Sequence, residues 1–392
     1  MRVGYKTIAY IICSLILSFY SFAIGQWKIF PHGVIKEVAN SIQNQSTNIK
    51  GEKTRFGEIV NLNDLEINQV NRLNNFNFEW GQLSVEGVGK VGAVELRGER
   101  VWYVNQNSPS LIEYLSLENT DYVEVKAIFS LKKNLYAYAA YIDGECASAR
   151  IVSLTDKHIA LQLSCLPSNE ADMNGAGGGW LKLSDSEILL ATGTPTSSSV
   201  ENKINKTAQL DESLWGKILK IKIDKNKFST EVFSKGHRNP QGIVKIKNNI
   251  LAAEHGPMGG DEINLISRGG NYGWPLQSLG SEYDLGVINK SYEKPILTKR
   301  PLFSFVPSIG ISDASICPTI YETYYAPNDC LIVASMRAGS IYFIVYDKDG
   351  ILFTEKIEFG SRIRKLIIKE NLVIGITDYE GLIIGELINL EN

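Results

Sequence analysis

Three polar side chains lie close together at the start of a predicted strand and have the chemistry of a ligand site. They are Arg238, Asn239 and Gln241, which flank Pro240 and precede Gly242. An arginine guanidinium forms paired hydrogen bonds with carboxylates, and each amide offers both donors and an acceptor. The set predicts a site for a planar, multiply charged ligand that is rich in oxygen atoms.

A glycine-rich loop, EHGPMGGDE, follows at residues 254–262. Its glycines and proline bend the backbone and expose carbonyl oxygens, and three carboxylates surround it: Glu254, Asp261 and Glu262. Crowded oxygen atoms of this kind are the ligands that Ca²⁺ prefers. The alternative is an ordinary glycine-rich turn with solvated acidic side chains.

The elements that must position these groups are short strands. Helical periodicity almost disappears beyond residue 55, and an alternating strand, a polar turn and a second apolar strand recur. Examples are residues 91–106, 180–193, 242–256 and 364–378. Valine, isoleucine and tyrosine favour a pleated, half-buried surface, and Asn, Asp or Gly supplies each turn. A unit that recurs at spacings of tens of residues predicts an all-β fold and favours a β-propeller, although a β-sandwich has similar strands.

A series of motifs carries a family resemblance. The segments GHRNPQG, EHGPMGGDEINLI and GGNYGWP lie within residues 236–275, and further matches are WGKILKI, VPSIGIS, SMRAGSIY and SRIRKL, followed by Thr377-Asp378. Together they resemble the soluble glucose, sorbosone and aldose dehydrogenases that depend on pyrroloquinoline quinone (PQQ). The resemblance covers roughly residues 170–390. It implies a six-bladed β-propeller and an oxidoreductase that transfers hydride from a sugar or related alcohol to PQQ.

The same resemblance implies which residues bind the cofactors. It assigns PQQ binding to basic and amide side chains: Arg238, Asn239, Gln241, Arg337, Arg362 and Arg364. It assigns calcium binding to the carbonyl oxygens of Gly256 and Pro257. For any single arginine the alternative is a solvated surface charge.

The chain departs from the family pattern where a general base is needed. Ala176 stands at the position of the family's histidine, and Thr194 stands where an aspartate is expected. A methyl group cannot accept the proton of a hydroxyl. Proton acceptance by a general base accelerates such reactions roughly 10²–10⁴-fold. Asp172 is the nearest carboxylate that could replace it, although a surface carboxylate is the simpler interpretation. The second functional hypothesis is therefore a catalytically silent propeller that binds a ligand or a protein.

The N-terminus predicts an extracytoplasmic protein. Arg2 and Lys6 precede an apolar run over residues 8–25, which is typical of a secretory signal peptide or of a membrane anchor. Residues 26–55 are polar and predict a tether, which leaves residues 56–392 for the propeller. We therefore expect a periplasmic or secreted location, with membrane contact only through the N-terminal segment.

Cysteine content agrees with this compartment. Apart from Cys13 in the apolar run, the chain has Cys146, Cys165, Cys317 and Cys330, which allow three pairings. Pairing Cys146 with Cys165 and Cys317 with Cys330 would close two short loops. Each bond would then stabilise the fold by about 3 kcal/mol in the chain-entropy model. Free buried thiols are the alternative.

Charge and composition restrict the partners. The 392 residues include 40 Lys and Arg against 43 Asp and Glu, a net charge of -3. A nucleic-acid-binding protein normally concentrates basic residues on one face, so this balance argues against such a partner. The expected partner is a small-molecule sugar or alcohol, and the sequence does not indicate an oligomeric state.

Overall fold

The computed structural model describes most of the second of two compact units, Met1–Thr47 and Asn48–Asn392. The described residues are 52–53, 58–61, 67–83, 91–96, 99–104, 121–197, 199–224, 227–283, 286, 288, 297–378 and 381–390. The predicted signal peptide or anchor, Cys13 and nearly all of the predicted tether lie outside them. Among these residues, no helix is long and apolar enough to cross a membrane.

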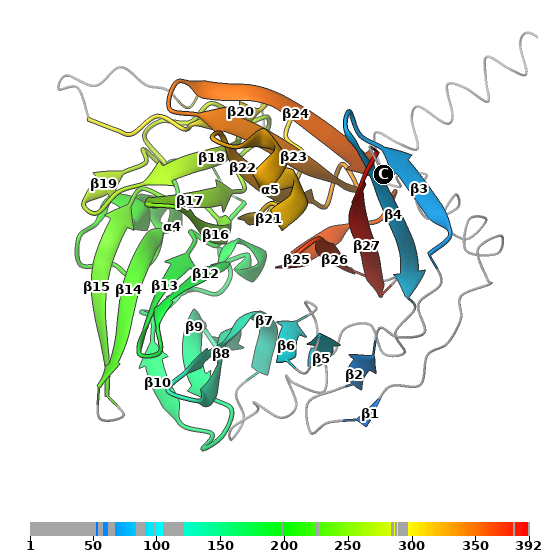
Figure 1. The fold of residues 1–392 in the computed structure, drawn as a ribbon. Coiled ribbons are helices and arrows are strands. Elements are labelled where there is room, and N and C mark those ends of the chain that lie inside the picture. The colour runs from blue at the N-terminus through cyan, green and yellow to red at the C-terminus, as the bar shows by residue number, and fades with distance from the viewer. Residues whose placement is uncertain are drawn as a thin grey trace, which may run out of the picture. The chain divides into compact units, whose positions relative to one another are not determined.

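The described residues form six β-sheets, so the all-β prediction is confirmed (Figure 1). The first sheet contains β1 (Glu52–Lys53), β2 (Glu58–Asn61), β5 (Val91–Leu96) and β6 (Glu99–Val104). The second contains β7 (Asp121–Leu131), β8 (Asn134–Asp143), β9 (Cys146–Ser153), β10 (Ile159–Gln162) and β11 (Leu166–Pro167). The third contains β12 (Gly177–Ser184), β13 (Glu187–Thr192), β14 (Lys217–Asp224), β15 (Lys227–Lys235) and β19 (Gly270–Asn271).

The remaining sheets come from the C-terminal half and from one N-terminal hairpin. The fourth contains β16 (Pro240–Ile246), β17 (Asn249–Glu254), β18 (Asp261–Ile266) and β20 (Phe303–Phe305). The fifth contains β21 (Ile311–Ile316), β22 (Asp329–Ser335), β23 (Ser340–Asp347) and β24 (Gly350–Glu358). The sixth contains β25 (Ile363–Lys369), β26 (Leu372–Thr377), β27 (Leu382–Asn389), β4 (Phe76–Leu83) and β3 (Gln69–Arg72).

Short helical segments lie between the strands. They are η2 (Met173–Gly175), α4 (Lys203–Lys206), η3 (Thr207–Gln209) and α5 (Thr319–Tyr325). Within most sheets the pairing is antiparallel between consecutive strands, but β2 and β5 pair in parallel. Central strands such as β22 are buried almost throughout, whereas β24, at a sheet edge, consists mainly of half-buried and exposed positions. This difference reflects apolar layers on both faces of a central strand.

The first strands of successive sheets pack against one another. Strand β7 contacts β12, β12 contacts β16, β16 contacts β21, and β21 contacts β25. Glycine permits the close approach of β12 to β16, because a Cβ atom at Gly179 would lie only 2.9 Å from the backbone nitrogen of Gly242. The loops that precede these strands are thereby brought together from distant parts of the sequence.

An N-terminal hairpin, β3–β4, and the last strands of the chain meet in the sixth sheet. Strand β27 pairs with β4 over eight residues, from Leu382 opposite Leu83 to Asn389 opposite Phe76. Phe76 is fully buried and its ring lies 5.2 Å from that of Tyr321 on α5. Because these partners are about three hundred positions apart in the sequence, this pairing closes the fold.

Two disulfide bonds staple the sheets locally. One joins Cys146, the first residue of β9, to Cys165, which lies just before β11. The other joins Cys317, at the end of β21, to Cys330 on β22. Both bonds join cysteines that are neighbours in the sequence, which is the local pairing among the three that the sequence allows.

Candidate active site

A cavity of about 350 Å³ lies where the loops before β12, β16 and β25 meet. Six of its lining residues were named from the sequence as cofactor-binding or catalytic candidates: Asp172, Arg238, Asn239, Gln241, Arg362 and Arg364. The lining also includes Thr194, His255 and Tyr283. Residues from seven separate stretches of the chain thus converge on one space.

Arg238 is held at the wall of this cavity by its guanidinium. Nη1 donates to the carbonyl oxygens of His255 at 3.0 Å and Gly256 at 2.9 Å. The guanidinium carbon lies 5.4 Å from the ring centroid of Trp274, within range of a cation–π contact. Nη2 reaches the hydroxyl of Tyr283 at 3.4 Å. These contacts place a permanent positive charge beside the cavity.

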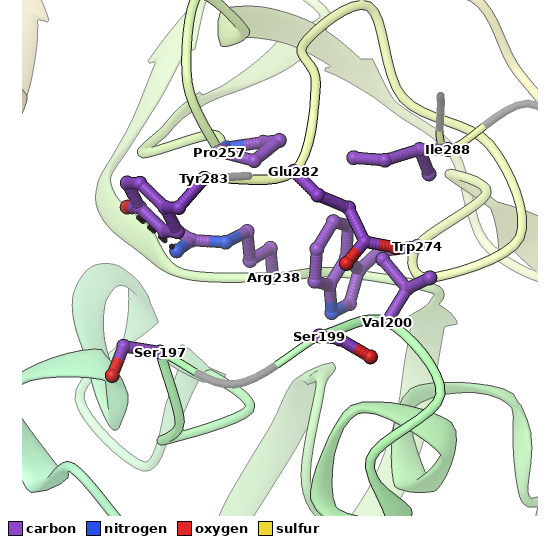
Figure 2. A pocket seen from close by; sticks show the side chains of 9 residues that line it. All are labelled: Ser197, Ser199, Val200, Arg238, Pro257, Trp274, Glu282, Tyr283 and Ile288. Atoms are coloured by element: carbon purple, nitrogen blue, oxygen red, sulfur yellow. Dashed lines mark hydrogen bonds between the residues drawn. The ribbon is translucent and has the colours of Figure 1, made fainter. Parts of the chain in front are cut away.

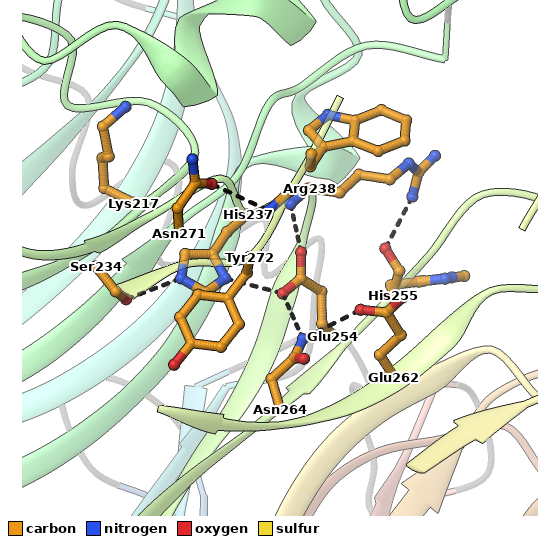
Figure 3. Close-up of polar contacts among 12 residues, drawn as sticks. Lys217, Ser234, His237, Arg238, Glu254, His255, Glu262, Asn264, Asn271 and Tyr272 are labelled. Carbon is orange, nitrogen blue, oxygen red and sulfur yellow. Dashed lines mark hydrogen bonds and ion pairs between the residues drawn. The ribbon is translucent and has the colours of Figure 1, made fainter. Parts of the chain in front are cut away.

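A buried polar network fixes the backbone of Arg238 (Figure 3). Glu254 accepts hydrogen bonds from the Arg238 backbone N–H and, over 2.9 Å, from His237 Nδ1. His237 Nε2 lies 2.8 Å from Ser234 Oγ, and its ring stacks on Tyr272 with centroids 4.7 Å apart. The Ser–His–Glu order resembles a hydrolytic triad. Ser234 is only 1% exposed and His237 is fully buried, so no substrate reaches them and the network has a positioning role.

The network continues to a second carboxyl group. Asn264 Nδ2 donates to Glu254 at 3.3 Å and to Glu262 at 3.2 Å. Burial, followed by the negative charge of Glu254, raises the pKa of Glu262 to about 8. Glu262 is therefore largely protonated at neutral pH, which limits the repulsion between two adjacent carboxyl groups.

Asn239 and Gln241 join β16 to the start of β12. Asn239 Oδ1 accepts from the Gly177 backbone N–H at 3.1 Å and from Gln241 Nε2 at 2.6 Å. Gln241 Nε2 also approaches the Gly177 carbonyl at 3.3 Å. Gly177 has a φ of 81°, and a Cβ there would lie 2.6 Å from the Ala191 carbonyl oxygen. The two amides thereby anchor the turn that leads from Asp172 into β12.

Arg362 and Arg364 share one carboxylate. Arg362 Nε lies 2.8 Å from Asp378 Oδ2, and Arg364 Nε pairs with Asp378 Oδ1. Their spacing of two residues directs both side chains to one face of the chain entering β25. With Arg238, three arginines face the cavity against Asp378 and Asp172, which leaves a net positive charge suited to an anion. Arg337 is exposed and does not belong to the lining.

The positions expected to carry a base are now placed. Ala176 is fully buried, its carbonyl accepts from the Tyr138 hydroxyl at 3.0 Å, and it is absent from the cavity lining. Thr194 lines the cavity, but its hydroxyl donates to Asn205 Oδ1 at 3.1 Å and accepts from Trp274 Nε1 at 2.9 Å. Asp172 caps η2 by accepting from the backbone N–H and the side-chain amide of Asn174.

His255 is a cavity residue to which the sequence analysis assigned no role. Its Nδ1 lies 3.1 Å from Asp261 Oδ1, and Asp261 Oδ2 accepts from the backbone N–H groups of Gly310 and Ile311. Burial raises the pKa of Asp261, but the hydrogen bond and charge of His255, with the backbone donors, hold it below its ordinary value. The His255–Asp261 spacing within EHGPMGGDE was a signal that could have been used.

The carbonyls expected to bind calcium already have partners. Gly256 oxygen accepts from the Arg238 guanidinium, and Pro257 oxygen accepts from Ser308 Oγ at 3.3 Å and the Gly260 backbone N–H at 3.2 Å. Across the described ranges, no group of three or more His, Cys, Asp and Glu side chains is placed to hold a metal ion. In this structure the Gly256 carbonyl is therefore bonded to the Arg238 guanidinium.

Comparison with known proteins gives a consistent picture. The sequence profile of the glucose/sorbosone dehydrogenase family matches residues 122–383. An uncharacterized protein of Synechocystis is 31% identical over 235 residues, 54% of each chain. An aldose sugar dehydrogenase of Escherichia coli is 36% identical over 126 residues, 29% of this chain and 34% of that protein. A quinoprotein glucose dehydrogenase B of Acinetobacter calcoaceticus is 38% identical over 109 residues, 25% of this chain and 21% of that protein.

Solved structures show the same fold. A glucose dehydrogenase crystal structure superposes with a TM-score of 0.53 at 22% identity, covering 66% of this chain and 81% of that chain. The apo form of the soluble aldose sugar dehydrogenase from Escherichia coli gives a TM-score of 0.52 at 16% identity. The superposition covers 87% of this chain and 99% of that chain. The fold is therefore that of the sugar dehydrogenase β-propellers. The matched region spans about half or less of the curated relatives' length.

Proposed function

Because the chain belongs to the glucose/sorbosone dehydrogenase family, we propose that it oxidises a sugar or related alcohol with PQQ as the hydride acceptor. One observation carries the proposal beyond family membership. The cavity gathers five of the six side chains that the sequence assigned to PQQ, from loops more than a hundred residues apart.

The donor set of the cavity fits PQQ. Three guanidinium groups complement a tricarboxylate, because charge-assisted bonds from arginine to carboxylates are the strongest in proteins. Asn239 and Gln241 add amide dipoles at the same wall. Arg337 follows Met336, which lines the cavity, and we propose that it completes the rim from outside. When bound, PQQ would supply the quinone that accepts the hydride.

We propose Asp172 as the group that accepts the proton of the substrate hydroxyl. It belongs to the cavity lining, and Asn174 orients its Oδ1 at 2.8 Å through the side-chain amide. Ala176 cannot serve, because it is buried and carries only a methyl group. A carboxylate held in this position can act as a general base toward a substrate hydroxyl.

Calcium binding at Gly256 and Pro257 is proposed only together with PQQ. The Gly256 carbonyl is engaged by Arg238, so a metal ion there requires the guanidinium to leave. An anionic cofactor would attract that guanidinium and release the carbonyl. Calcium affinity should accordingly rise when PQQ is present and stay low in its absence.

The wider setting is part of the same proposal. We propose a six-bladed propeller in which the six sheets are the blades and the β27–β4 pairing closes the last one. We also propose an extracytoplasmic location, periplasmic or secreted. The two disulfides support it, because such bonds persist in oxidising compartments. Cleavage or retention of residues 1–25 remains a prediction.

A reconstitution experiment tests the function. The purified chain is titrated with PQQ, with and without Ca²⁺, while quinone absorbance is followed. A panel of aldoses is then supplied with an artificial electron-accepting dye. We expect saturable PQQ binding and dye reduction with at least one sugar. PQQ binding without dye reduction for any sugar or alcohol would favour the silent propeller instead, and absence of PQQ binding would remove the cofactor assignment.

A further inference from the structure

Two parts of the cavity wall are supported in different ways. At one part, the Arg238 guanidinium is held by two carbonyls and an indole and reaches the Tyr283 hydroxyl (Figure 2). At the other, Asp172, Asn174 and Gly175 line the cavity from η2 and its N-cap, a single turn of 3₁₀ helix. Hydrogen-bond geometry in a 3₁₀ turn is poor. The place of Asp172 at the wall therefore depends on contacts from outside the turn.

The contact behind this turn comes from a buried lysine on β7. The Lys126 ammonium donates to the Asn174 carbonyl oxygen and to Glu124 Oε2, each at 3.0 Å. The side chains of Lys126 and Glu124 are only 1% and 5% exposed, and neither residue lines the cavity. From Asn174 the contact continues to Asp172, because the Asn174 side-chain amide donates to Asp172 Oδ1 at 2.8 Å. Lys126 thus reaches Asp172 through one intermediate residue.

The local shape of β7 directs the lysine toward the turn. The pairing of β7 with β8 changes register twice, and the second change leaves Lys126 between the paired residues Val125 and Ala127. Such a bulge redirects the side chain of the extra residue. Strand β12 begins directly against it, since a Cβ atom at Gly178 would lie 2.9 Å from Lys126 Cβ. Both η2 and β12 contact β7, so the lysine, the turn and the strand after the turn form one packed unit.

The Lys126–Glu124 pair contributes more to geometry than to stability. Burial lowers the pKa of Lys126, and the charge and hydrogen bond of Glu124 oppose this shift. The charges of Arg364 and Lys365 lower the pKa further. Glu124 Oε1 is buried and has no hydrogen-bond partner among the residues that the structure describes. The cost of removing two charges from water largely cancels their attraction. What the pair supplies is a donor fixed against the Asn174 carbonyl.

We infer that Lys126, held by Glu124, is a positioning residue that fixes the η2 turn and with it the Asp172 carboxylate at the cavity wall. The inference rests on the proposed function for what Asp172 does there. The placement of the turn needs neither PQQ nor substrate, so it is tested separately. Lys126 does not line the cavity and acts through Asn174.

Amide hydrogen exchange on the full chain without PQQ tests the placement of the turn. The double variant Glu124→Gln/Lys126→Met removes both charges, so that neither is left buried alone, while the Asn174 carbonyl loses its donor. Peptides that cover residues 172–176 should exchange about tenfold faster than in the wild type. Glu124→Gln alone should exchange like the wild type, because the glutamine oxygen still accepts from Lys126.

The matched control removes an exposed pair of the same kind. Lys182 Nζ and Asp185 Oδ1 lie 2.8 Å apart at the end of β12, and Lys182→Met/Asp185→Asn should leave exchange at residues 172–176 unchanged. Wild-type exchange of these residues in Glu124→Gln/Lys126→Met would overturn the inference.

Dye reduction tests the consequence for the reaction. The Glu124→Gln/Lys126→Met variant should lower kcat about tenfold or more while KM and PQQ affinity stay unchanged, because only the reacting geometry is disturbed. Asn174→Ala changes an exposed position and should lower kcat similarly, since Asp172 Oδ1 loses its donor. A wild-type kcat in either variant would contradict the positioning role. Absence of dye reduction by the wild type, together with faster exchange in the double variant, would refute the proposed function and leave the placement of the turn intact.

Discussion

The raised pKa of Glu262 predicts a stability that falls as pH rises. Its ordinary value is 4.5 and burial beside Glu254 raises it to about 8. The protonated form is favoured in the folded protein, so this contribution is fully present below pH 4.5 and is lost as the pH rises through about 8. The full shift in pKa corresponds to a change of about 5 kcal/mol in the free energy of unfolding between low and high pH. Because the residue is only partly buried from solvent, we expect about 2–3 kcal/mol.

Glu262→Gln isolates this effect, since glutamine mimics the protonated carboxyl group. Urea unfolding of both proteins is measured at pH 5, 7 and 9. At pH 5 the two should differ by less than about 1 kcal/mol, and at pH 9 the variant should be more stable by about 2–3 kcal/mol. Glu358→Gln, an exposed residue on β24, should follow the wild type at every pH. Parallel curves for wild type and Glu262→Gln would show that the carboxyl group ionises freely in the folded state.

Three further changes test the site and the scaffold. Arg238→Ala should weaken PQQ binding about 10- to 100-fold in an absorbance titration, because it removes a charge-assisted contact, and unchanged affinity would place the cofactor elsewhere. Asp172→Asn should lower the dye-reduction rate about 10²- to 10⁴-fold while the PQQ titration stays the same, whereas an equal rate would exclude it as the base. Replacing Cys317 and Cys330 together by Ser should cost about 3 kcal/mol in urea unfolding, and an unchanged midpoint would show that the bond contributes nothing.

Alternation and turn residues predicted the strands well, because each strand's burial pattern is local information. The segment 242–256, for example, contains most of β16 and all of β17 on either side of the Lys247-Asn248 turn. Pairing between distant strands is not local. Neither the parallel β2–β5 pair nor the eight-residue β27–β4 pair has a signal in the sequence, since only the closed fold brings those segments together.

In the candidate site, too, residue types could be predicted from the sequence, whereas contacts between distant residues could not. Motif resemblance identified Arg238, Arg362 and Arg364, which converge on one cavity. It also named Arg337, which is exposed and outside the lining. His255 was considered as a base and given no role, because its interaction with Asp261 depends on the turn at 256–260 that brings the two side chains together. A side chain's residue type is visible in the sequence, but its partner depends on the backbone path between them.

The glycine-rich loop changes meaning once its hydrogen bonds are known. From composition it is a set of oxygen ligands for a cation, and the structure places the Arg238 guanidinium against one of those carbonyls. Glu254 holds the backbone of the same arginine, so the loop and the strand before it position Arg238 from two directions. Arg238 donates a hydrogen bond to the Gly256 carbonyl, and a move of its guanidinium toward a cofactor carboxylate would cost this charge-assisted hydrogen bond. If the cavity binds an anionic cofactor, as we propose, we expect the loop to contribute to the free energy of binding, because Arg238 must then leave this carbonyl.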